Sequence, residues 1–121
     1  MKALPKKAPE WMNDEQRAEY ALMLPLFEEV GANMMDHAAV FGYCVNYVLW
    51  KTATHEMEAN GGAVIETPRG QLQINPWHTV AKQAEEKVVK AYKELLISPG
   101  SRKRMKIEMA KTKTKDDFFD V

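Results

Sequence analysis

The stretch from Gly61 to Arg104 constrains the fold more than any other part of the sequence, because turn signals alternate there with regular segments. Gly61-Gly62 opens it, and two short apolar runs, 63–67 and 71–74, flank Pro68-Arg69-Gly70. This pattern predicts a small β-hairpin whose turn holds its glycine last. A lone hairpin is marginal in water, so we expect it to pack on helices or on a neighbouring subunit.

Asn75-Pro76 follows the hairpin and predicts the start of a long helix. The Asn75 side chain can cap free amides, and Pro76 loses nothing at the first helical position by lacking an N–H. Apolar residues recur on one face from Trp77 onward, with charged residues opposite. Ser98-Pro99 repeats the arrangement and predicts a fourth helix to about Ala110.

An earlier helix is predicted from Asn13, an N-cap that forms a capping box with Gln16. It should run to about Leu24, where Pro25 is expected to stop it. Trp11, just before it, is interpreted as a packing anchor.

A second helix is predicted over 34–59, capped by Asn33 or Asp36 and ended by Gly61-Gly62. Its centre, 40–50, is rich in aromatic and β-branched residues, so a strand is the alternative; length favours helix. Apolar groups there cover nearly the whole circumference, and so small a chain has little material to bury them. We therefore predict a homo-oligomer, with the interface formed by Phe41, Tyr43, Tyr47, Val48 and Trp50.

Together these segments predict an all-α fold of about four helices, with a small β-hairpin between the second and third. Residues 11–110 are expected to form a single helical domain. Residues 1–10 contain two prolines and three lysines and are expected to be a flexible basic arm, and 111–121 a flexible tail. We expect Trp50 and Trp77 in the core rather than at a ligand site.

The charges balance at 17 basic and 17 acidic residues, but they are unevenly distributed. Residues 11–97 are net negative, whereas 98–115 carry seven basic side chains against Glu108 alone. Such a segment favours nucleic acid, because cations that neutralise phosphates release counterions without reading sequence. The alternative is a solvated helix end that aids solubility, and the residues alone leave both open. The basic residues are Arg102, Lys103, Arg104, Lys106, Lys111, Lys113 and Lys115.

No catalytic, metal or cofactor site is legible in the sequence. There is no phosphate-binding Gly-x-x-x-x-Gly-Lys loop, and the three histidines and Cys44 lack metal-site spacing. The protein is therefore not expected to be an enzyme. Cys44 is the only cysteine, which favours a reducing compartment, and the longest apolar run is far below the ~20 residues that span a bilayer. We expect a soluble cytoplasmic protein with no membrane partner.

The order of three motifs resembles the small terminase subunit of tailed bacteriophages: Gly61-Gly62, Asn75-Pro76, and Ser98-Pro99 followed by 100–104. The resemblance covers most of the chain, from Trp11 to Met105. It implies an all-α protein with a small hairpin that assembles into rings in the host cytoplasm. It also implies binding to double-stranded viral DNA near its packaging start and delivery to a large subunit that holds the ATPase and nuclease.

Two alternatives stay open: a helical scaffolding oligomer with no direct DNA role, and a small DNA-binding regulator. The net-negative middle of the chain gives little support for DNA running along a basic central surface. The C-terminal basic segment, with Lys2, Lys6 and Lys7, is the better candidate. The acidic end, 116–121, carries Phe118 and Phe119, which we expect either to dock onto the large terminase subunit or to fold back on the chain's own oligomer.

Overall fold

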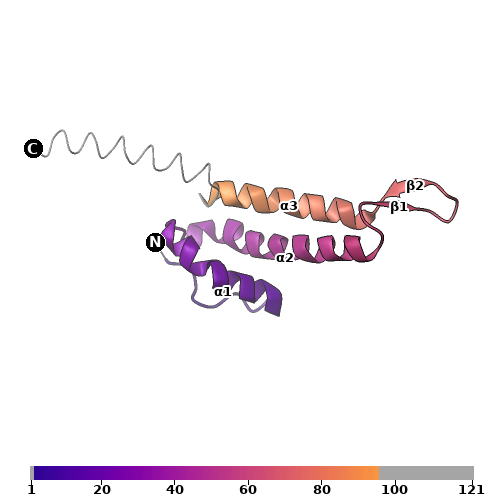
Figure 1. The fold of residues 1–121 in the computed structure, drawn as a ribbon. Helices are drawn as coiled ribbons and strands as arrows, with labels where there is room; N and C mark the ends of the chain where they lie inside the picture. The colour runs from indigo at the N-terminus through magenta and orange to yellow at the C-terminus, as the bar shows by residue number, and fades with distance from the viewer. Residues whose placement is uncertain (1, 96–121) are drawn as a thin grey trace, which may run out of the picture.

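The computed structural model describes residues 2–95, and within them the chain forms three α-helices and a two-stranded hairpin (Figure 1). In order these are α1 (Asp14–Glu29), a short 3₁₀ turn η1 (Met34–Asp36), α2 (His37–Ala59), β1 (Val64–Glu66), β2 (Leu72–Ile74) and α3 (Pro76–Glu94). The mainly helical fold and the place of the hairpin are confirmed. The fourth predicted helix lies outside the described residues.

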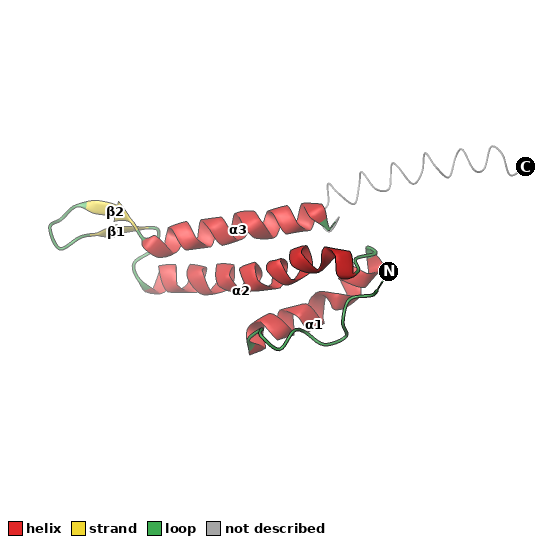
Figure 2. Cartoon of the chain, turned by 180° about the vertical axis from the view of Figure 1, so that it is seen from behind, coloured by secondary structure: helices red, strands yellow, loops and turns green. Residues whose placement is uncertain are grey.

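The two long helices, α2 and α3, run antiparallel side by side, and α1 packs on α2 from the other side (Figure 2). The hairpin projects past the end of this pair, opposite the end where the N-terminus lies (Figure 1). Helix is confirmed for 40–50, where the sequence left a strand open. The α2 boundary differs slightly, because Asn33 caps the 3₁₀ turn while the Asp36 side chain forms no cap bond.

The start of α1 is as predicted, since Asn13 and Gln16 exchange the two bonds of a capping box. Its predicted end at Leu24 is wrong: the helix continues through Pro25 to Glu29. Pro25 removes one helical hydrogen bond, but Leu24 and Phe27 on either side of it are buried. Packing of these two side chains outweighs the missing bond, and the helix stops only near Gly31, whose φ is +83°.

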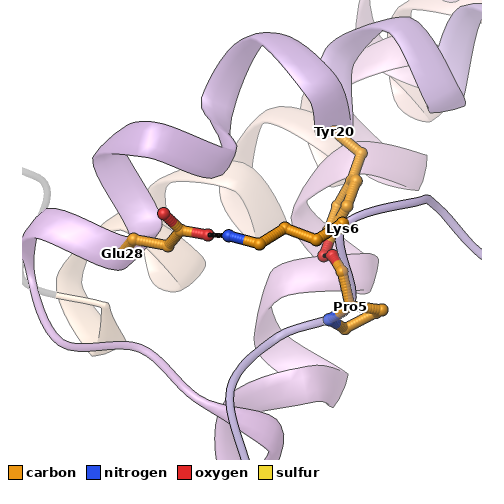
Figure 3. A network of polar contacts seen from close by, with 4 residues as sticks. All are labelled: Pro5, Lys6, Tyr20 and Glu28. Atoms are coloured by element: carbon orange, nitrogen blue, oxygen red, sulfur yellow. Dashed lines mark hydrogen bonds and ion pairs between the residues drawn. The ribbon is translucent and has the colours of Figure 1, made fainter.

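Residues 2–10 are packed rather than free, which corrects the flexible arm expected from their prolines and lysines. Ala3 forms a single antiparallel bridge with Asn33, and Leu4 is buried. The Tyr20 hydroxyl donates to the Pro5 carbonyl. The Lys6 ammonium lies 3.1 Å from the Glu28 carboxylate (Figure 3), although this pair is exposed and contributes little.

The core is concentrated at the end of the molecule where all three helices meet. Large side chains fill it, among them Tyr20, Phe27, Val40, Tyr43 and Val88. Toward the hairpin, beyond α1, the buried residues of α2 and α3 are small: Ala53, Ala81 and Ala84. The two helices therefore approach closely there, and that half of the molecule is only two helices thick.

Candidate functional site

The joint between the helices and the hairpin is built around Asn75, which is only 2% exposed. Its side-chain oxygen Oδ1 accepts from the Trp77 amide at 3.0 Å, as expected of an N-cap. Its side-chain amide donates to the Gly62 carbonyl at 2.9 Å and lies 3.3–3.4 Å from the carbonyls of Met57 and Asn60. One side chain thus ties the end of α2, the base of the hairpin and the start of α3 together.

The hairpin itself is short and regular. Val64 pairs with Ile74 and Glu66 with Leu72. The Gly70 amide donates to the Thr67 carbonyl at 2.8 Å, closing the turn that the sequence predicted. Gly70 has a φ of +83°, a conformation that favours glycine.

The apolar side chains on one face of this hairpin are exposed. Partners directly opposite in an antiparallel pair share a face, so Val64, Ile74 and Leu72 lie together. Their exposed fractions are 55%, 62% and 77%. The expectation that the hairpin packs on its own helices is not met for this face. Its other predicted environment, a neighbouring subunit, stays a prediction.

The predicted interface on α2 is divided by the fold. Tyr43 and Val48 are buried within the chain, so neither is available to a second subunit in this fold. Phe41, Tyr47 and Trp50 are partly exposed. Part of the apolar surface that seemed to need an oligomer is therefore covered by α1 and α3.

A partly buried polar network lies around Tyr43. The Tyr43 hydroxyl donates to the Glu19 carboxylate at 2.7 Å and lies 3.3 Å from the Tyr92 hydroxyl, which links all three helices. Burial raises the pKa of Tyr43 well above its ordinary value, helped by these two bonds. Burial also raises the pKa of the neighbouring Cys44 thiol to about 12. These groups stay protonated near neutral pH, which suits a structural role and not a nucleophile.

A basic surface that the sequence did not bring together lies beside the N-terminal segment. Lys6, Lys7 and Arg17 line a shallow depression of roughly 380 Å³ together with Glu10. The Arg17 guanidinium donates to the Glu10 carbonyl at 2.6 Å, which holds the helix against this segment. The sequence did not show that Lys6, Lys7 and Arg17 lie together, because Arg17 belongs to α1 whereas the two lysines precede that helix.

Several predicted site residues lie outside the described residues: the seven C-terminal basic residues, Ser98, Pro99, Phe118 and Phe119. Asn75, Pro76 and Trp77 lie at the start of α3 as predicted. Trp77 and Trp50 are half-buried, and Trp11 is 65% exposed although its ring meets Phe41 edge-on.

Over residues 2–95, no group of three or more histidine, cysteine or acidic side chains is arranged to hold a metal ion. Within the same residues, no helix has the length and apolar character needed to cross a membrane.

Comparison with known families agrees with the order of motifs. The family model described as "Phage terminase, small subunit" matches residues 17–112. This match covers most of the 121 residues, so the chain belongs to the small-subunit family of phage terminases. No curated protein and no solved structure matches it.

Proposed function

We propose that this protein is the non-catalytic subunit of a viral genome-packaging motor, which recognises double-stranded viral DNA and hands it to the large ATPase and nuclease subunit. The family match over residues 17–112 carries this proposal. The match extends past α3 to include five of the seven predicted DNA-binding residues. These are Arg102, Lys103, Arg104, Lys106 and Lys111.

The charge distribution supports a DNA contact away from the helical body. Residues 2–95 hold ten basic and thirteen acidic side chains, so the positive excess lies beyond Leu95. Within the described part, Lys6, Lys7 and Arg17 form the basic depression beside α1. We expect the C-terminal segment to contribute most of the affinity and this depression to add to it.

The test is DNA retention across a salt series. Neutralising Arg102, Lys103, Arg104 and Lys106 to glutamine should weaken binding to duplex DNA. The slope of log K against log salt should fall by roughly 0.9 for each DNA phosphate that the variant no longer neutralises. A control that removes three charges elsewhere neutralises Lys82, Lys87 and Lys90, which are exposed on α3, and should leave the slope nearly unchanged.

The two variants separate the candidate functions. If the C-terminal variant keeps the parent's slope while the native assembly is intact, the basic residues serve solubility and a scaffolding role is favoured. If the slope falls equally in both variants, binding is a diffuse charge effect and the assignment to 102–106 is wrong.

A further inference from the structure

We propose that the hairpin of one subunit packs on the exposed stripe of α2 in a second copy of this chain, forming a head-to-tail contact. The proposal deepens the self-assembly expected of the proposed function by assigning it two surfaces. The hairpin face consists of Val64, Leu72 and Ile74, with Glu66 and Arg69. The α2 stripe consists of Tyr47, Trp50, Lys51, Thr54, His55 and Glu58.

The hairpin face needs a cover that residues 2–95 of its own chain do not provide. Of the nine large hydrophobic residues exposed in the described part, three belong to these two short strands. Exposure of an apolar face to water does not stabilise a two-stranded hairpin. Such hairpins are marginally stable without a packing partner.

The α2 stripe is the corresponding open surface on the helices. Its residues recur at helical spacing along one side of α2 and line a shallow groove of roughly 530 Å³. It lies in the second half of α2, between Tyr47 and Glu58, toward the end that leads into the hairpin. The Tyr47 and Trp50 rings meet edge-on at 6.2 Å, and Lys51 lies 5.5 Å from the Tyr47 ring.

Among the described residues, the hairpin that occupies the stripe comes from another copy. The chain's own hairpin projects past the end of α2 and does not turn back along the helix (Figures 1 and 2). Asn75 fixes that direction through its bonds at the hairpin base, including the one to Gly62. A chain cannot fold this hairpin back onto its own α2 without breaking the joint.

The order of charges matches between the two surfaces. From Tyr47 to Glu58 the stripe is about 16 Å long. The strand from Val64 to Thr67 rises about 10 Å before the turn at 67–70, so the hairpin fits within the length of the stripe. Along the hairpin, the apolar pair Val64 and Ile74 is followed by the acidic Glu66 and then by the basic Arg69. Along α2, the aromatic pair Tyr47 and Trp50 is followed by the basic Lys51 and then by the acidic Glu58.

When the hairpin lies along α2 in that direction, its apolar residues contact the aromatic pair. Glu66 then lies near Lys51, and Arg69 lies near Glu58. Each copy offers one hairpin and one stripe, so the contact is heterologous and generates a closed ring or an open chain. The sequence prediction placed the interface on Phe41, Tyr43, Tyr47, Val48 and Trp50; this contact keeps two of those residues and adds the hairpin.

Native mass spectrometry tests the contact. Leu72→Asp removes the hairpin surface and Thr54→Asp disrupts the stripe, so each variant alone should appear at the chain mass of 13.8 kDa. Mixed together, they should form a pair of twice that mass and nothing larger, because each retains one working surface. Circular dichroism should report the parent's helix content for both. Glu85→Arg, an exposed change elsewhere on α3, is the control and should assemble as the parent does.

Charge reversal tests how the hairpin of one copy is aligned along α2 of the next. Arg69→Glu and Glu58→Arg should each lower assembly, and the double variant should restore it. A parent that runs as a monomer at micromolar concentration overturns the proposal, as does a Leu72→Asp variant that assembles normally. DNA retention by the same variants is read separately, so failure of this interface is distinguishable from failure of the DNA-binding function.

Discussion

The side-chain amide of Asn75 donates to the Gly62 carbonyl at 2.9 Å, across the base of the hairpin. This bond joins two residues that the sequence marks independently, one as a helix cap and the other as a helix stop. The cap was predictable because its partner is two residues away. The bonds across the hairpin base were not, because they depend on the end of α2 lying beside the start of α3.

Asn75→Ala should therefore cost more than the loss of an ordinary cap. The change removes the cap, worth about 1 kcal/mol, and takes the side-chain donor away from the Gly62 carbonyl, at about 1–3 kcal/mol. We expect the free energy of unfolding to fall by about 2–4 kcal/mol in urea denaturation at fixed protein concentration.

Asn75→Asp separates the two roles. Aspartate caps a helix as well as asparagine does, but it has no amide and places a carboxylate against the carbonyls. We expect it to be at least as destabilising as the alanine variant. Full stability in Asn75→Asp would show that only the cap matters.

Trp77→Ala should destabilise the protein less than the removal of a fully buried tryptophan, which costs about 3–5 kcal/mol. Trp77 is half-buried, so we expect less than about 3 kcal/mol. Trp11→Ala, at a position 65% exposed, serves as the comparison and should cost less still. Equal stability of the Trp77 variant and the parent would place that ring on a functional surface.

Pro25→Ala should stabilise the protein, by about 1–2 kcal/mol, because it restores a helical hydrogen bond inside α1. Pro25 is exposed, so the replacement leaves no cavity. Thermal and urea unfolding measure the gain. An unchanged or lower stability would indicate that the restriction proline imposes on the unfolded chain outweighs the missing bond.

Structural features that depend only on residues close together in the sequence could be predicted from it. Asn13, Asn75 and the turn at Gly70 were predicted correctly because each depends on neighbours within four residues. The continuation of α1 past Pro25 and the packing of Leu4 depend on side chains distant in sequence, which local patterns do not encode. The exposure of the hairpin face could not be predicted from local patterns either. Alternation of apolar and polar residues indicates a strand but does not show what covers it.

Stability should fall with rising pH above pH 9. The folded-state pKa of Cys44 is raised from 9.0 to about 12, mainly by burial, and that of Tyr43 is raised above 10.0. In this range the unfolded chain releases protons that the folded chain keeps, so the free energy of unfolding decreases as pH rises. The Cys44 contribution is complete below pH 9.0 and is lost toward about pH 12.

Each such group contributes a slope of up to about 1.4 kcal/mol per pH unit. Urea denaturation over this range, with Cys44→Ala as the matched variant, measures it. The variant should be less stable at neutral pH but should show a shallower alkaline slope. The same slope in variant and parent would mean that the thiol does not titrate in the range expected.

The acidic end, 116–121, gives the last prediction. Phe118 and Phe119 follow Asp116 and Asp117 just after the basic residues, and their rings offer anchor area for a groove on another protein. We expect deletion of 116–121 to leave the native assembly intact and to weaken binding to the large terminase subunit, because the anchor rings are removed. A variant with both phenylalanines changed to alanine should reproduce the weaker binding. Changing Asp116, Asp117 and Asp120 to asparagine, which keeps the rings, should retain most of the binding. Undiminished large-subunit binding by the deletion variant would exclude this docking role, and disrupted assembly would show instead that the segment packs on its own oligomer.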